Sequence, residues 1–186
     1  MRVTKEQKEQ TRTKIIEAAG QGFRTHGYGG LGVDGLAKGA DVTSGAFYGH
    51  FSSKGEAFKA AIEKGMEDYA DTVRALQKQH GDYWMQEFLD YYLGEDHRNN
   101  LSGSCAVPGL SAEVMRADQS AKDIYQEGLI KTAQALAEDN KDETDDALAL
   151  MALLAGSVLL SRSVSSKETA EKISKATRKF IEKLSN

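Results

Sequence analysis

The side chains in this sequence that could carry out chemistry are one thiol and four imidazoles. Cys105 is the sole cysteine, and the histidines stand at positions 26, 50, 80 and 97 without the spacing of metal ligands. One cysteine excludes an internal disulfide framework and a thiolate-rich zinc site. We therefore expect neither a metal nor another cofactor.

Cys105 stands where a helix is expected to begin. Ser104 can cap that helix, or Pro108 can occupy its first turn, and both arrangements bring the thiol to the positive end of the helix dipole. This position favours the thiolate, so Cys105 is a candidate redox or electrophile sensor, with a small buried core residue as the alternative. A thiol enzyme also needs a base, and the nearest histidine, His97, lies in a charged segment that we expect to be a flexible loop.

A second group of polar side chains lies between residues 43 and 54. A short helix is predicted here, with Thr43 or Ser44 as its N-cap and only small side chains in its first turn. Such an N-terminus can approach a phosphate group or the floor of a DNA groove. Tyr48, His50 and Lys54 add hydrogen-bond donors on the exposed side, whereas Phe47 and Phe51 are expected in the core.

The elements that must position these residues are helices. One proline, no alternating β-branched runs and no internal repeat predict an all-α fold of about nine helices. Residues 32–51 form two helices around a tight turn, too short to be stable alone, which pack on a helix from Lys5 to His26 that ends at Gly27. A long helix with apolar residues at spacings of three and four runs from about Phe58 to Leu76. Further helices are predicted near 82–94, 108–117, 118–139, 142–164 and 167–184.

Charge is distributed unevenly along the chain. Residues 1–60 hold nine Lys and Arg against six Asp and Glu, whereas the whole chain has a net charge of −4. A locally basic N-terminal unit on an acidic body suits a DNA-binding protein. No apolar run approaches the ~18 residues of a membrane span, and the N-terminus lacks the apolar core of a secretory signal. We expect a cytoplasmic protein with no membrane partner.

The segment from Ile15 to Phe58 resembles the DNA-binding domain of the TetR family of bacterial repressors. The resemblance rests on Ala46-Phe47-Tyr48-Gly49-His50-Phe51 and on Ser53-Lys54 with Phe58 four residues further on. It implies a three-helix DNA-binding head over residues 1–52, with the family signature at about 9–69, and an effector-binding and dimerisation body over residues 53–186. Its implied partners are double-stranded operator DNA, a small-molecule effector and a second copy of the chain. The DNA-binding residues implied are Thr43, Ser44, Gly45, Ala46, Tyr48, His50 and Lys54.

Two departures from the family pattern concern the start of the second helix. Many relatives have Thr or Ser where Leu31 and Gly32 stand, so the usual cap is in question. Gly35 and Gly39 replace better helix formers, which predicts a less rigid head when DNA is absent.

The segment from Leu101 to Val114 resembles a branch of the family in which a cysteine precedes a Leu-Ser-Ala-Glu-Val-like stretch. Some members of that branch sense electrophiles or oxidants through the cysteine, and Cys105 matches its position. The resemblance therefore implies a regulator, most simply a repressor, that is released from DNA by an effector or by modification of Cys105. A thiol-dependent enzyme and a helical interaction module without DNA binding are the alternatives.

Two sets of apolar residues in the body are expected to form an effector pocket and a dimer interface. Aromatic and methionine side chains that can enclose an effector pocket are Met66, Tyr69, Trp84, Phe88, Tyr92, Met115 and Tyr125. The helix near 142–164 is apolar on nearly all sides, so it must be buried on all sides, and a second copy can cover it. The predicted dimer interface comprises Met151, Leu154, Val158, Phe180, Ile181 and Leu184.

Overall fold

The computed structural model describes residues 4–138, 140 and 143–184, and these residues form helices and connecting turns with no strand. The predicted all-α fold is therefore confirmed. The helices are α1 Lys5–Gly30, α2 Val33–Gly39, α3 Ser44–Tyr48, α4 Lys54–His80, the 3-10 turn η1 Gly81–Tyr83, α5 Trp84–Leu93, α6 Glu95–Asn99, α7 Ala106–Arg116, α8 Gln119–Leu136, α9 Thr144–Ser163 and α10 Lys167–Leu184.

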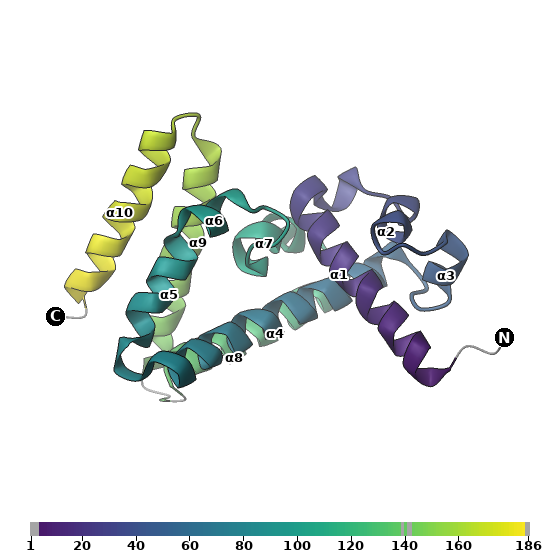
Figure 1. Cartoon of the computed structure of the whole chain (residues 1–186), viewed down its shortest axis with the longest axis horizontal. Helices are drawn as coiled ribbons and strands as arrows, with labels where there is room; N and C mark the ends of the chain where they lie inside the picture. Colours follow the sequence, from purple (N-terminus) through teal and green to yellow (C-terminus); the bar gives the residue numbers. More distant parts are fainter. Residues whose placement is uncertain (1–3, 139, 141–142, 185–186) are drawn as a thin grey trace.

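Helices α1, α2 and α3 gather at one end of the molecule (Figure 1). Their apolar side chains at Ile15, Phe23, Leu36 and Phe47 are fully buried, so each short helix is held by packing on α1. The predicted stop at Gly27 is a bend rather than an end. Gly27 takes φ 71° and ψ 167°, and one further turn continues to Gly30 in a new direction.

Helix α4 connects this end of the molecule to the rest of the chain. It lies beside α8 along much of its length (Figure 1). Phe58, Ile62, Met66, Tyr69 and Val73 form its buried stripe, as the spacing of three and four predicts. A displacement of α4 relative to α8 therefore changes the position of the head.

The remaining helices differ from expectation mainly at their ends. The segment expected to be a loop at 94–104 contains a helix, α6, in which His97 is buried. Helix α7 starts at Ala106, so Pro108 falls in its first turn, where a missing N–H group has no cost.

Helix α9 is apolar on every side but is buried on only some of them. Met151, Leu154 and Val158 pack inside the protomer, mainly against α8 and α10. By length and composition α9 could cross a membrane, since its mean hydropathy reaches 1.5, and 39% of that window is buried within the chain.

Candidate DNA-binding head and effector-binding body

Helix α3 is held by two side-chain hydrogen bonds at its start. The Thr43 Oγ1 atom accepts a hydrogen bond from the backbone N–H of Ala46 at 3.1 Å, so Thr43 is the N-cap. The Ser44 hydroxyl donates to Asp34 Oδ1 of α2 at 2.5 Å. These bonds fix α3 relative to α2 while Thr43 and Gly45 remain exposed.

Tyr48 lies at the end of α3, and His50, two residues further on, lies close to Lys8 and Arg12 of α1. The side chain of Tyr48 is 57% exposed and contacts the edge of Phe47. The pKa of His50 is lowered by partial burial and then by the positive charges of Lys8 and Arg12. The Arg12 guanidinium lies 5.0 Å from the centre of the Phe51 ring. Cations from α1 therefore stand next to the end of α3, an arrangement suited to phosphate groups.

The ammonium group of Lys54 points toward the protein. Its Nζ atom donates to the carbonyl oxygens of Tyr28 at 2.9 Å and Leu31 at 3.3 Å. It also lies 4.1 Å from the centre of the Tyr28 ring. Lys54 thus caps the carbonyl end of α1, a structural role that the sequence motif does not distinguish from a phosphate contact.

The residues that depart from the family pattern pack against one another. Gly32 caps α2 without a side-chain hydrogen bond, as expected. A Cβ atom on Gly22 would lie 2.4 Å from Leu31 Cδ2, and one on Gly35 would lie 2.5 Å from Leu31 Cδ1. The two glycines therefore make room for Leu31, a packing role that the sequence did not indicate, while the lower rigidity expected from Gly35 and Gly39 stays a prediction.

The predicted effector residues occupy several different environments. Tyr69, Phe88 and Tyr92 form a buried aromatic stack, and the Trp84 Nε1–H donates to Glu138 Oε1 at 3.0 Å. Met66 is buried between α4 and α8, and the Tyr125 hydroxyl is hydrogen-bonded to Ser111 at 2.6 Å. Met115 is 67% exposed. Its position at the surface end of α7 corrects the expectation that it lines a pocket.

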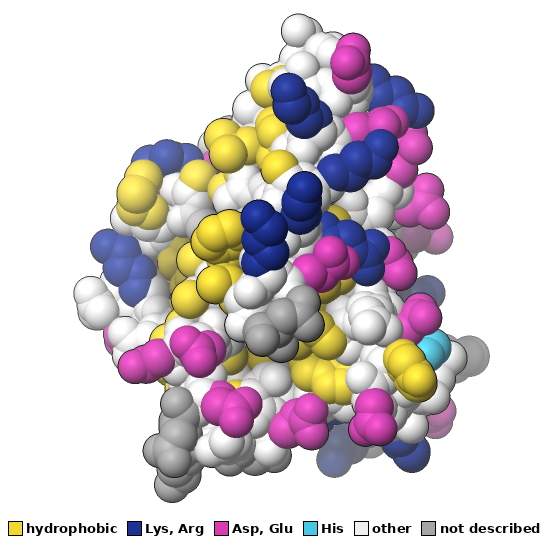
Figure 2. Space-filling model, turned by 90° about the vertical axis from the view of Figure 1, so that its left-hand side faces the viewer, with side chains coloured by type: hydrophobic (Ala, Val, Ile, Leu, Met, Phe, Trp, Pro, Cys, Tyr) yellow, Lys and Arg dark blue, Asp and Glu magenta, His cyan; other side chains and the backbone are white. Residues whose placement is uncertain are grey.

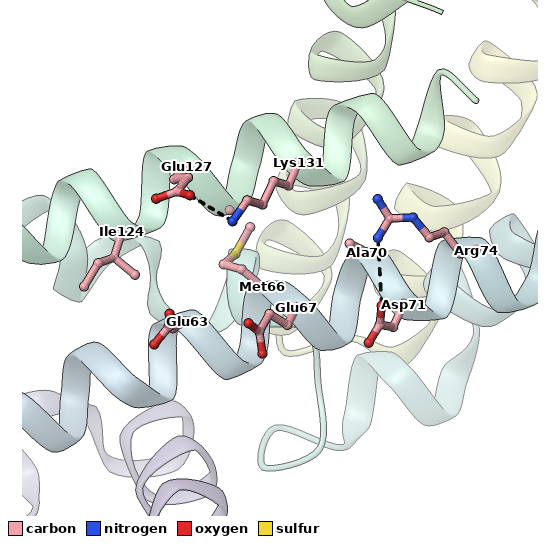
Figure 3. A pocket seen from close by; sticks show the side chains of 10 residues that line it. Glu63, Met66, Glu67, Ala70, Asp71, Arg74, Ile124, Glu127 and Lys131 are labelled. Carbon is pink, nitrogen blue, oxygen red and sulfur yellow. Dashed lines mark ion pairs between the residues drawn. The ribbon is translucent and has the colours of Figure 1, made fainter. Parts of the chain in front are cut away.

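A groove of about 360 Å³ runs between α4 and α8. Met66, Ala70 and Ile124 line its apolar part, and charged side chains stand around it (Figure 3). Arg74 pairs with Asp71 and Lys131 pairs with Glu127. Glu63 and Glu67 also line the groove, so it carries a net negative charge.

Cys105 is the N-cap of α7, and its Sγ accepts a hydrogen bond from the Val107 backbone N–H at 3.4 Å. Cys105 is half-buried by surface exposure, and burial of its thiol raises the pKa to about 11, against smaller opposing effects of that bond, of the Tyr92 hydroxyl and of Arg24 and Arg162. The expectation that the helix dipole favours the thiolate is corrected, because desolvation outweighs it.

His97 supports the segment before Cys105. Its Nε2 accepts the backbone N–H of Cys105 at 3.1 Å, so its proton lies on Nδ1, which donates to the Tyr92 carbonyl at 2.8 Å. Burial lowers the pKa of His97. Both ring nitrogens are occupied, so His97 is not free to take a proton from the Cys105 thiol.

Two arginines near Cys105 were not singled out from the sequence. Arg24 of α1 donates to the Ser102 carbonyl, and Arg162 of α9 donates to the carbonyls of His97 and Arg98. A glycine inside α7, Gly109, was the available signal, because a Cβ atom there would lie 2.8 Å from the Arg24 side chain. Among the described residues, no three His, Cys, Asp or Glu side chains gather as metal ligands do.

The outer face of α9 and α10 carries exposed apolar side chains bordered by charged ones (Figure 2). Phe180 and Leu184 lie on it, as predicted. Met151, Leu154, Val158 and Ile181 are corrected, because each is buried inside the protomer. The exposed apolar residues here are Leu153, Leu159, Leu160, Val164, Phe180 and Leu184.

Comparisons with known proteins agree with this geometry. Residues 15–61 match the model of the family described as bacterial regulatory proteins, tetR family. Over 84 residues the chain is 33% identical to the HTH-type transcriptional repressor SCO4008 of Streptomyces coelicolor, covering 45% of this chain and 43% of that protein. Over 79 residues it is 35% identical to the HTH-type transcriptional regulator TtgR of Pseudomonas putida, covering 42% of this chain and 38% of that one. The chain thus aligns with less than half the length of these relatives.

Solved structures resemble the whole fold. The reduced form of NemR from E. coli has a TM-score of 0.74 at 20% identity, covering 93% of this chain and 96% of that one. A TetR-family regulator from Agrobacterium tumefaciens has a TM-score of 0.75 at 15% identity, covering 95% of this chain and 98% of that one. At these identities the likeness establishes the fold alone.

Proposed function

Since the chain belongs to the TetR family of bacterial regulatory proteins, we propose that it is a dimeric cytoplasmic repressor that leaves its operator when a small effector binds the body. Transcriptional regulation through a DNA-binding domain, and not catalysis, is the activity of the family. The observation that carries the proposal is α3, a capped short helix with an exposed N-terminus, joined to the body through α4.

The proposed DNA contacts follow from the placement of α3. Thr43, Ser44, Gly45 and Ala46 face the bases, since small side chains let the N-terminus of α3 enter the major groove. Tyr48 and His50 donate to phosphate groups beside Lys8 and Arg12. Lys54 contributes positive charge near the backbone while its ammonium group caps α1.

The proposed dimer is formed by the outer face of α9 and α10 (Figure 2). Leu160 is 60% exposed there, together with five other large apolar residues. A contiguous apolar face of this kind marks an interface. A two-fold copy covers the same face on both protomers and can set two α3 helices one turn of DNA apart, ~34–36 Å.

The proposed release mechanism passes through α4. An effector that binds the body better when α4 is displaced shifts the head away from its DNA-binding position. Coupling is reciprocal, so saturating operator DNA must weaken effector binding by the same factor. Modification of Cys105 is the less favoured trigger, because its raised pKa suppresses the reactive thiolate.

The proposal is tested by selection of bound sequences from random DNA and from the DNA upstream of the chain's own gene. We expect a two-fold symmetric site, and Tyr48→Phe, which removes one hydroxyl, should weaken binding about three- to tenfold for all sites alike. Tyr83→Phe, at an exposed tyrosine outside the head, is the matched control. If no sequence is enriched, the chain is a helical module that has lost DNA binding.

A further inference from the structure

A small cavity lies where the head meets the body. It measures about 100 Å³ and separates α4 and α5 from the start of α7. Its lining includes Arg24, Asp68, Tyr69, Tyr92, Ser104 and Cys105. For comparison, an apolar protein cavity of about 150 Å³ holds benzene, so this one has room for about four or five non-hydrogen atoms.

Two tyrosine hydroxyls in this lining have no partner at full hydrogen-bond geometry among the described residues, although they interact with each other and Tyr92 interacts with the Cys105 thiol. Tyr69 is 5% exposed and Tyr92 is 1% exposed, and both hydroxyl oxygens are fully buried. Burial raises the pKa of each phenol well above its ordinary value, so both remain neutral hydrogen-bond donors. Buried donors without partners are rare in folded proteins, and a missing acceptor is a common reason for them.

The charged side chains around this cavity are two arginines and one aspartate. Arg24 and Arg162 are half-buried, act electrostatically on Cys105, and donate to backbone carbonyls rather than to a carboxylate. The Nη1 atom of Arg162 is buried without a partner. Asp68, the carboxylate in the lining, is already paired with Lys64. Arg24 and the two phenols therefore line the space together with Asp68, and Arg162 adds positive charge from outside the lining.

We propose that this cavity binds the carboxylate group of a short organic acid with two or three carbon atoms. One carboxylate oxygen accepts the hydroxyl groups of Tyr69 and Tyr92, and the positive field of Arg24 and Arg162 stabilises the charge. The volume favours acids of this size over longer chains and aromatic acids. A ligand this small reaches at best a micromolar to millimolar Kd.

Arg24 links this site to the head. It belongs to α1, its guanidinium holds the Ser102 carbonyl, and its stem packs on Gly109 of α7. A bound carboxylate competes with Ser102 for the guanidinium, and so changes the contact between α1 and the segment before Cys105. The regulatory part of this inference rests on the proposed function, whereas the binding part does not.

The test is direct titration of the purified, DNA-free protein with acetate, propionate and benzoate by NMR and calorimetry. We expect propionate to bind at millimolar or lower concentration and benzoate not to bind. Tyr69→Phe and Tyr92→Phe should each weaken propionate binding about tenfold, with Tyr83→Phe as the control. Propionamide, which has nearly the same shape without the charge, should bind at least about tenfold more weakly than propionate.

Several results would overturn the inference. Equal binding of propionamide would show that charge is not recognised, and binding unchanged in both tyrosine variants would place the ligand elsewhere. A crystal grown with propionate that shows only water in the cavity would mean that the tyrosine hydroxyls bind water and not a carboxylate. Operator binding is measured separately, so loss of sequence-specific DNA binding rejects the proposed function and leaves the carboxylate site standing.

Discussion

The guanidinium of Arg24 donates two hydrogen bonds to the carbonyl oxygen of Ser102, from Nε at 2.8 Å and from Nη2 at 2.5 Å. The two residues are 78 positions apart and belong to the first helix of the head and to the segment before α7. This half-buried charged group on a backbone carbonyl is a polar contact that links the head to the body.

Arg24→Met removes that charge and keeps a stem of similar length against Gly109. We expect the variant to lose about 1–3 kcal/mol of stability, because the Ser102 carbonyl loses its charged donor. Operator affinity without effector should change little, whereas the effect of an effector on that affinity should shrink. Gel-shift titrations with and without effector measure this, and Arg74→Met, at a surface pair on α4, is the control. Full retention of the effector response in Arg24→Met would exclude this contact as the link.

His97 predicts a pH dependence of stability. Its folded-state pKa lies below the unfolded value of about 6.5, because burial disfavours the imidazolium. The unfolded chain therefore binds a proton first, and stability falls as the pH drops from about 6.5 through the folded pKa. Thermal unfolding between pH 7.5 and 5.5 (roughly the window in which carboxylates stay ionised) should show a falling Tm.

The control for this prediction is His97→Gln, which cannot titrate. His50 also has a lowered pKa, so a residual slope is expected in the variant. The difference between the two proteins isolates His97. Parallel Tm curves for wild type and His97→Gln would show that the imidazole is accessible to protons in the folded state.

The Cys105 thiol should react slowly with disulfide reagents. A pKa of about 11 leaves very little thiolate near neutral pH, so reaction with a disulfide reagent at pH 8 should be at least about a hundredfold slower than for an unhindered thiol. The same chain unfolded in urea is the internal control, because it has the same single cysteine. Equal rates in the folded and unfolded chains would restore the sensor hypothesis.

The sequence was sufficient to predict the helices that have strong apolar periodicity or a local motif. Helix α4 and its buried stripe followed from spacing, and the helix-turn-helix followed from Thr43 to Phe51. What was not predictable depends on contacts between residues far apart in the chain. The burial of His97 depends on Cys105 and Tyr92, and the role of Arg24 depends on Ser102.

The sequence also did not predict which α9 side chains are buried and which are exposed. A helix that is apolar on every side has no periodic signal to separate Leu154, which is buried, from Leu160, which is exposed. The same limit applies to Leu31 and Gly35, since a glycine reads as a weak helix former until the side chain that fills its space is known.

Leu31 and Gly35 predict a non-additive pair of substitutions. Gly35→Ala normally stabilises a helix by about 1 kcal/mol, but here its Cβ would lie 2.5 Å from Leu31 Cδ1. We expect Gly35→Ala alone to be neutral or destabilising, and the same change in a Leu31→Ala background to be stabilising. Urea unfolding of the four proteins gives the coupling, expected at about 1–2 kcal/mol. Additive effects would mean that Leu31 moves aside freely.

Leu160 tests the proposed dimer. Its side chain is 60% exposed on α9, so Leu160→Glu leaves the protomer core intact but places a charge within the exposed apolar face. We expect a folded monomer by sedimentation or light scattering, and an operator affinity at least about a hundredfold weaker, because a monomer binds only one half-site. Met115→Glu is the matched control, since Met115 is 67% exposed on α7, away from this face. A Leu160→Glu protein that remains dimeric would move the interface off α9, whereas monomers of both variants would point to a general effect of added charge.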